Sequence, residues 1–418
     1  MTKKMKLISL LTSFALIGCA LDVDNPNSLL EADLGDPSAA GAVANGGWNA
    51  TLNGVGYIMI ANAVAGDEVV WTGSRDAWRE LDNGGMTNVY NEFVDGAWPF
   101  ITEGRWMADK AVSVLEAFQA DGSLPDSQDL VRAYLTAAMV RVYIADMFDD
   151  FVYSDKTVSG TPFGDAGMSV MYDEATALLG KAASIATGDN VVRVAAMKAR
   201  VAHAKAVWGK VNPVNTSSPY VNAGTAEAAA ALALMDGDYK WKMIYGPGTV
   251  SNEMSWQING RLEMDLVDSP AHDNTKGGDP IPNDLVTGAK DTRILAEEAV
   301  FRTDYGGTDY APVTIVSARE MHLIIAEGKM AGGDAAGTLA ELNKIRALDG
   351  LAEYTTEDAG AALQHERRAN LFVQGRRLPD MYRFGHTSTK WVSGVLSGPG
   401  VFFPIPISEI RSNDNITQ

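Results

Sequence analysis

Apolar residues recur with the period of an α-helix through most of the chain between about residues 92 and 235. The segment 132–148 carries apolar residues at positions i, i+3, i+4 and i+7, and 191–208 and 225–235 repeat this character. Alanine at the contact positions of such segments allows antiparallel helices to approach each other closely. The pattern predicts a mainly α fold, a scaffold of tetratricopeptide-like helical hairpins, although no strict consensus repeat can be read.

Capping residues predict where several helices begin. Asp36 is expected to cap a first helix that has Pro37 at its first position. Ser317 and Glu320 have the spacing of a capping box, in which each side chain binds the backbone N–H of the other residue. This box predicts a helix that extends to about Ala331.

A second helix is predicted to follow that one directly. The chain is expected to turn at 332–333 and to restart with Asp334 as N-cap, through Leu348. Residues 319–348 would then form a helix–turn–helix unit. A further helix is expected over about 357–375, and the last thirty residues are expected to be irregular.

The stretch 240–316 differs in composition from the helical segments around it. It is rich in Gly, Pro, Asn and Asp, with short runs that contain Trp and Tyr. Such composition predicts long loop insertions with a few short strands.

The N-terminus has the features of a bacterial lipoprotein signal. Three lysines precede the apolar run Leu7–Ile17, and Cys19 follows the small residue Gly18. The run is too short to cross the ~30 Å core of a bilayer. Residues 1–18 are therefore predicted to be a signal peptide, Cys19 the lipidation site and 19–35 a tether. The alternative is an ordinary secretory signal with an unrelated cysteine, although Cys19 is the only cysteine of the chain.

The charge of the chain limits its partners. Residues 1–18 contain three lysines and no acid, so the remainder carries 31 Lys+Arg against 53 Asp+Glu, a net charge of −22. Such a surface repels nucleic acid and anionic lipid headgroups. We therefore expect no nucleic-acid partner and membrane attachment through the lipid anchor only.

Four segments of the second half follow one another in the order known from one protein family. They are 319–330 (REMHLIIAEGKM), 334–351 (DAAGTLAELNKIRALDGL), 366–385 (ERRANLFVQGRRLPDMYRFG) and 403–413 (FPIPISEIRSN). Together with the lipobox, they resemble the RagB/SusD family of outer-membrane nutrient-uptake lipoproteins. The resemblance is sharp over 317–413 and diffuse over 36–235.

The resemblance implies a tetratricopeptide-like helical scaffold decorated by loops, with residues 36–418 as one domain and 240–316 as its divergent loop region. It also implies a protein on the outer membrane, facing the cell exterior, that captures an oligosaccharide or peptide ligand. Its expected partner is a SusC-like TonB-dependent transporter. Ala20 after the cysteine, in place of the aspartate that retains lipoproteins at the inner membrane, points to the same location.

Arginines are concentrated in the third of these segments. Glu366 and Asp380 lie among them, and guanidinium groups bind carboxylates through paired hydrogen bonds. We expect structural ion pairs that join the last helix to the C-terminal tail, which Pro404 and Pro406 hold extended. The arginines are Arg367, Arg368, Arg376, Arg377 and Arg383.

Aromatic residues in polar, glycine-rich surroundings are the candidate ligand-binding residues, because sugar rings stack on aromatic faces while polar groups bind their hydroxyls. Trp71, Arg75, Trp78 and Tyr90 lie within one such segment. Trp256 and Tyr305 of the loop region are further candidates. In contrast, the tryptophans flanked by helical apolar residues are assigned to the core, namely Trp98, Trp106 and Trp208.

Residues that would indicate catalysis or a cofactor are scarce. The five histidines are scattered, and the sequence contains no HExxH zinc motif, no P-loop and no GxSxG nucleophile motif. We therefore predict no enzyme activity, no metal site and no cofactor. Two other hypotheses stay open: a lipid-anchored polysaccharide-degrading enzyme with a carboxylate pair, and a helical scaffold that binds only protein.

Overall fold

The computed structural model describes residues 33–155, 158–266, 280–302, 309–392 and 400–416. The predicted signal peptide, Cys19 and most of the tether lie outside these residues. The helices of the first half are α2 (Ala40–Ala65), α3 (Asp76–Asp82), α4 (Glu92–Ala120), α5 (Ser127–Met147), α6 (Val170–Ala183), α7 (Asp189–Val211) and α8 (Thr225–Leu232). The second half contains α9 (Glu253–Ser255), the π-helical turn η4 (Trp256–Gly260), α10 (Thr292–Arg302), α11 (Ala318–Ala331), α12 (Ala335–Leu348), α13 (Ala359–Asn370), α14 (Arg377–Phe384) and α15 (Ile407–Ser412).

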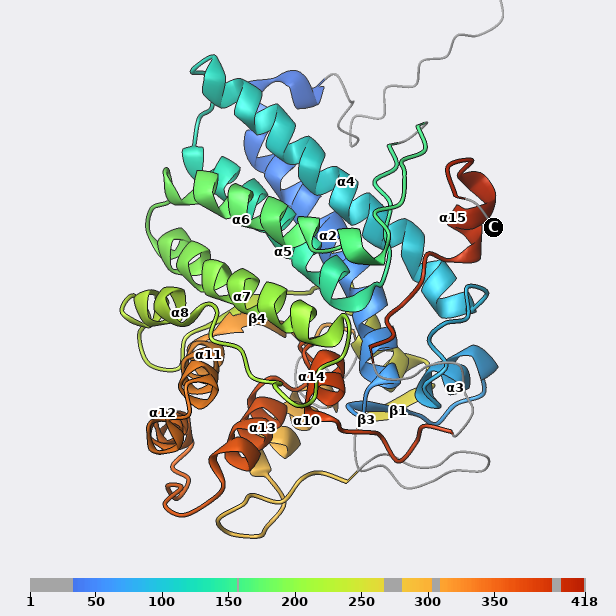
Figure 1. Ribbon diagram of the computed structural model, residues 1–418. Coiled ribbons are helices and arrows are strands. Elements are labelled where there is room, and N and C mark those ends of the chain that lie inside the picture. The colour runs from blue at the N-terminus through green and yellow to red at the C-terminus, as the bar shows by residue number, and fades with distance from the viewer. Residues whose placement is uncertain (1–32, 156–157, 267–279, 303–308, 393–399, 417–418) are drawn as a thin grey trace, which may run out of the picture.

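Consecutive helices pack against each other to form a stacked array. The contacts pass from α4 to α5, α6, α7 and α8, then to α11, α12 and α13. Figure 1 shows this array descending from α4 and α6 at the top to α12 at the lower left. The predicted mainly α fold of helical hairpins is confirmed.

Helix α2 lies against α4, and glycines set how closely the two backbones approach. A Cβ atom on Gly54 would lie 2.4 Å from the carbonyl oxygen of Phe100, and one on Gly104 would lie 3.0 Å from the Cα of Thr51. The Thr51 hydroxyl donates a hydrogen bond to the Gly104 carbonyl at 3.1 Å. Glycine is therefore required at position 54, because any side chain there would force the helices apart, and a side chain at position 104 would also press on α2.

Four short strands form two antiparallel pairs among the described residues. Strand β1 (Val69–Trp71) pairs with β3 (Met264–Leu266), and β2 (Lys240–Met243) pairs with β4 (Val313–Ser317). The second half of the chain is thereby tied to α2, which β1 follows. The expectation of loops with a few short strands over 240–316 is right for these segments but wrong for 292–302, which form α10.

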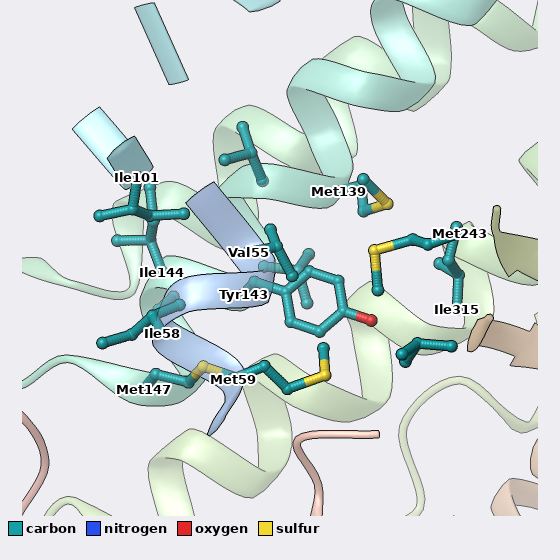
Figure 2. Close-up of a cluster of buried hydrophobic side chains, with 14 of the residues drawn as sticks. Val55, Ile58, Met59, Ile101, Met139, Tyr143, Ile144, Met147, Met243 and Ile315 are labelled. Carbon is teal, nitrogen blue, oxygen red and sulfur yellow. The ribbon is translucent and has the colours of Figure 1, made fainter. Parts of the chain in front are cut away.

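Apolar side chains from helices and strands meet in one buried cluster. Figure 2 shows Val55 and Ile58 of α2 beside Tyr143 and Met147 of α5, with Ile315 of β4 close by. All five are almost completely buried. The core thus joins the helical array of the first half to the β2–β4 pair.

The predicted caps are largely present. The carboxylate of Asp36 accepts a hydrogen bond from the Ser38 N–H at 2.8 Å, and that of Asp334 accepts one from the Gly337 N–H at 2.8 Å. Ser317 accepts from the Glu320 N–H at 3.1 Å. The reciprocal half of the capping box was expected wrongly, because the carboxylate of Glu320 binds Arg200 and Arg376 instead. The helix–turn–helix over 319–348 is confirmed by α11 and α12.

The helix predicted over 357–375 is shorter than expected. Helix α13 ends at Asn370, and the chain then turns through positive φ angles at Val373 (49°) and Gly375 (74°) before α14 begins. The Val373 N–H donates to Glu68 Oε1 at 2.7 Å. This contact holds a β-branched residue in a conformation that such residues rarely adopt.

The carboxylate of Glu327 on α11 is the centre of a buried polar cluster, called here the Glu327 cluster. It binds the guanidinium groups of Arg383 and Arg367, His203 Nε2 at 2.9 Å, and the Val221 N–H at 3.0 Å. Burial would raise the pKa of Glu327, but Arg383 and His203 hold it well below its usual range. One carboxylate therefore joins α7, the loop before α8, α11, α13 and α14.

The arginine-rich segment forms structural ion pairs, as predicted, but with different partners. Arg377 and Arg368 bind Asp67, which follows α2, and Arg383 and Arg367 share Asp380. The expected connection to the C-terminal tail is wrong, because these side chains point into the body between helices. The tail is held by a backbone hydrogen bond from the Phe403 N–H to the Met147 carbonyl at 3.0 Å and by the buried Phe403 ring.

Removing the hydroxyl of Ser317 should weaken the start of α11. Ser317→Ala is expected to lower the free energy of unfolding by about 1 kcal/mol, because the Glu320 N–H loses its acceptor. Urea denaturation measures this loss. The matched control is Ser169→Ala, since Ser169 precedes α6 without a side-chain capping bond, and it should cost less. Equal losses in both variants would contradict the cap.

Replacing Glu327 should have a much larger effect. Glu327→Gln leaves the two buried guanidinium groups of Arg383 and Arg367 with Asp380 as the one carboxylate that they share, and it should lower stability by about 3–5 kcal/mol at neutral pH. Glu327→Gln is to be compared with Glu227→Gln, because Glu227 is exposed on α8 and should be nearly neutral. The ionised carboxylate stabilises only the folded state, so the difference from wild type should shrink as pH falls below about 4.3. A pH-independent difference would contradict this assignment.

Candidate functional site

An open groove of about 580 Å³ lies where α3 and the loop before α4 meet. Polar side chains line it almost entirely. They are Ser74, Arg75, Asp76, Glu80, Asn88, Tyr90, Asn91 and Glu92, together with Ala77. The sequence placed Arg75 and Tyr90 in the candidate site, and the structure brings both to this one groove.

The floor of the groove is a fixed hydrogen-bonded unit. The side-chain amides of Asn88 and Asn91 both donate hydrogen bonds to the Glu80 carboxylate, at N–O distances of 2.9–3.0 Å. Asn91 also caps α4, because its side-chain oxygen Oδ1 accepts hydrogen bonds from the N–H groups of Phe93 and Val94 at 3.1 and 3.3 Å. The start of α4 thus orients polar groups toward the groove.

The rim of the groove carries groups that a ligand can reach. Tyr90 is 63 % exposed, and the guanidinium of Arg411 on α15 lies 5.9 Å from its ring centroid. Arg75 and Glu92 face each other with 3.4 Å between Nη1 and Oε1, and both side chains are about half exposed. An exposed ion pair of this length contributes little stability, so its charged groups are available for other hydrogen bonds.

Glu263, just before β3, holds the loop that carries Arg75. Its carboxylate accepts from the Ser74 N–H at 2.9 Å, the Ser74 hydroxyl at 3.0 Å and the Arg75 N–H at 3.1 Å. Burial alone would raise the pKa of Glu263, but the donated backbone hydrogen bonds outweigh it and lower the pKa. A side chain on Gly73 would clash with Glu263, which explains the glycine.

Trp71 and Trp78 do not line the groove, and the prediction that they form a ligand surface is corrected. They are 4 % and 2 % exposed, and Trp78 stacks on Phe93 of α4 with 3.8 Å between ring centroids. The polar neighbours that suggested a surface position lie on the outer face of α3, while Trp78, Leu81 and Asp82 form its inner face. Both tryptophans belong to the buried core cluster.

The remaining aromatic candidates lie elsewhere. Trp256 on η4 is exposed, but it is not among the residues that line the groove. Tyr305 lies outside the described residues. Of the tryptophans assigned to the core, Trp98 is buried, whereas Trp106 and Trp208 are only half-buried. The proposed ligand contacts of Arg75, Tyr90 and Trp256 stay predictions.

Comparison with solved structures identifies the fold. A SusD superfamily protein from Parabacteroides distasonis superposes with a TM-score of 0.66 at 15 % identity, covering 94 % of this chain and 99 % of the other. A SusD superfamily protein from Bacteroides fragilis superposes with a TM-score of 0.64 at 16 % sequence identity, covering 92 % of this chain and 99 % of the other. A laminarin-binding SusD-like protein superposes with a TM-score of 0.60 at 17 % sequence identity, covering 90 % of this chain and 98 % of the other. The chain has the SusD-superfamily fold.

Sequence comparison alone detects no such relative. No family model matches the chain, and no curated protein matches it in sequence. The fold that the resemblance of the four C-terminal segments implies is confirmed by the solved structures. Within the described residues of that fold, no helix is long and apolar enough to cross a membrane.

One histidine of the SusD-like fold lies beside two carboxylates. Ligand atoms of Asp284, Asp291 and His365 lie within 4.8 Å of one another, all buried. Sequence reasoning did not find this cluster, because His365 lies 74 residues along the chain from Asp291. Arg346 and Arg293 already bind the two carboxylates, at 2.6 Å in each case. Glu366 binds the same two arginines, so the cluster is part of a buried ion-pair network.

Several groove residues were missed by sequence reasoning. Asn88, Asn91 and Glu92 flank Tyr90 in the sequence, so a search for polar residues around exposed aromatics would have found them. Glu80 could be assigned only after its face of α3 was known. Arg411 gives no sequence signal, because α15 reaches Tyr90 only through the path of the C-terminal tail (Figure 1).

Proposed function

We propose that this protein is a surface-exposed outer-membrane lipoprotein that binds a nutrient oligomer and delivers it to a TonB-dependent transporter. A glycan is the favoured ligand, and a peptide is the alternative. The SusD-like fold supports the proposal, as does the similarity to a protein that binds laminarin. The lipobox at Cys19 supports the membrane location.

The observation that carries the proposal is an exposed tyrosine at the rim of a polar groove. A sugar ring can stack its apolar face on Tyr90 while its hydroxyls exchange hydrogen bonds with charged side chains. Arg75 supplies donors, and Asp76 and Glu92 supply acceptors, all at the groove. The open shape suits one segment of a longer oligomer, because both ends of such a chain can leave the groove.

The protein is proposed to act without chemistry. The Glu80 carboxylate in the groove accepts hydrogen bonds from Asn88 and Asn91, which fits a structural role. Release of shorter sugars from a bound oligosaccharide, abolished by substitution of one carboxylate, would favour the enzyme hypothesis instead.

Removing the Tyr90 ring should weaken glycan binding. The chain without residues 1–18 is first tested for binding to laminarin and to the glycans of a glycan array. Tyr90→Ala should lower affinity roughly fivefold or more, since stacking on an aromatic ring is worth on the order of 1 kcal/mol. Isothermal titration calorimetry measures this change. The melting temperature should be nearly unchanged because Tyr90 is exposed.

Two further variants distinguish the possible sites. Tyr90→Phe keeps the ring and should retain most of the affinity. Trp256→Ala removes the other candidate aromatic residue, which does not line the groove, and it should lower affinity less than Tyr90→Ala does. Loss of binding in Trp256→Ala, with full binding in Tyr90→Ala, would move the ligand site to η4 and contradict the groove.

Cys19→Ala should release the processed protein from the membrane, because the thioether-linked lipid cannot form. Fractionation of cells that express the full chain measures this, and mass spectrometry excludes the uncleaved precursor. Protease treatment of whole cells tests whether the wild-type protein faces the exterior. A processed Cys19→Ala protein that stays in the membrane fraction would contradict lipid anchoring.

A further inference from the structure

A second cavity, of about 410 Å³, lies on the helical array away from the groove. It lies between α2, α5, α7 and β2 and is called here the cationic cavity. Its lining residues are Ala44, Trp48, Arg132, Leu135, Thr136, Arg193, Lys240, Trp241, Lys242 and Ile244. A cavity of this volume accommodates a small ligand of one or two sugar rings.

The cationic cavity and the groove are separate sites. Gly54 of α2 faces Phe100 and Ile101 of α4, and Gly47 faces Met107 and Ala108, so the two helices are antiparallel. In this register the groove residue Glu92 lies about 14 residues along α2 from Trp48. At 1.5 Å per residue, the two sites are at least about 20 Å apart along the helix axis.

Two tryptophans form one wall of the cationic cavity. The rings of Trp48 and Trp241 stack at 5.9 Å between centroids with 17° between their planes. The guanidinium of Arg193 lies 5.5 Å from the centroid of Trp241. Ile244 at the opening is 61 % exposed, which is unusual for a large apolar side chain. The cavity thus offers a flat apolar surface beside a positive charge.

The charge of the cavity is opposite to that of the chain. Its lining contains four cationic side chains and no carboxylate, although acids outnumber bases by 53 to 34 in the sequence. Asp129, Asp189 and Asp238 pair with Arg132, Arg193 and Lys240 from outside the cavity lining.

Lys242 differs from the other three cations because it forms no ion pair with any described residue. It lies on β2 between the buried residues Trp241 and Met243, and its side chain is only partly exposed. A partly buried ammonium group without a counter-ion attracts an anion more strongly than an exposed one does. Lys242 also acts electrostatically on the carboxylate of Glu297. Burial raises the pKa of Glu297, and the positive charges of Lys240 and Lys242 oppose this rise.

We propose that the cationic cavity is a second ligand site, which binds an acidic sugar unit carrying a carboxylate or a sulfate. The apolar face of the sugar would stack on the tryptophan wall, and its anionic group would bind Lys242 with Arg193 or Lys240. Both acidic groups share this chemistry. The site does not depend on the groove or on its proposed ligand.

The test compares charged and neutral forms of the same sugar. Trigalacturonate, its methyl ester and a sulfated galactobiose are titrated into the chain without residues 1–18. Trigalacturonate should bind about tenfold more tightly than its ester, and its affinity should fall as salt is added. The sulfated sugar shows which acidic group is preferred. Equal affinity for acid and ester would overturn the proposal.

Variants assign the binding to the cavity. Lys242→Gln should lower affinity for trigalacturonate about three- to tenfold, and Trp48→Leu should also lower it. The control Lys205→Gln, an exposed lysine of α7 outside the cavity lining, should have no effect. Lys242→Gln should leave laminarin binding and the melting temperature unchanged, so it reports on the site even if Trp48→Leu impairs folding.

Two results would contradict the proposal in distinct ways. Loss of trigalacturonate binding in Tyr90→Ala, with full binding in Lys242→Gln, would place acidic sugars in the groove. Competition by benzoate at the same concentration as trigalacturonate would show that the cavity recognises a flat carboxylate and not a sugar. Failure of laminarin to bind would bear on the groove alone.

Discussion

The buried carboxylate of Glu327 is the interaction on which the arrangement of the second half depends. A buried charge is tolerated only when charged and hydrogen-bonding partners compensate for its lost hydration. The partners of Glu327 come from α7, the loop before α8, α13 and α14, so compensation is complete only when these elements are docked together. The cluster therefore specifies one arrangement of helices that apolar packing alone would leave less well defined.

Ion pairs extend this constraint to the site. Arg377, at the start of α14, binds Asp67 in the turn that leads from α2 into β1. Burial would raise the pKa of Asp67, but Arg377 and Arg368 hold it low, whereas burial raises the pKa of the adjacent Glu68 to about 8. One charged and one protonated carboxyl side by side avoid a repulsive buried pair. Strand β1 then positions α3, which forms one side of the groove.

The rigid array separates two surfaces of different chemistry. The groove beside Tyr90 has polar groups of both charges, and it is formed by α3, the loop before α4 and the start of α4. The cationic cavity is formed by side chains on long helices and a paired strand, with an apolar wall and only positive charges. Because helices α2 and α4 connect both surfaces and pack at glycine contacts, the distance between the two sites is fixed.

The sequence by itself determined the helices and the caps at Asp36, Ser317 and Asp334, because these depend on contacts between residues near in sequence. The family resemblance also came from the sequence, through the four C-terminal segments. It also brought Arg75 and Tyr90 to one site, since both belong to one polar segment. Only the tertiary structure decided the rest. Trp78 is buried because one face of α3 docks on α4, and the Glu327 partners meet because distant helices pack together. Periodicity and composition carry no information on such contacts.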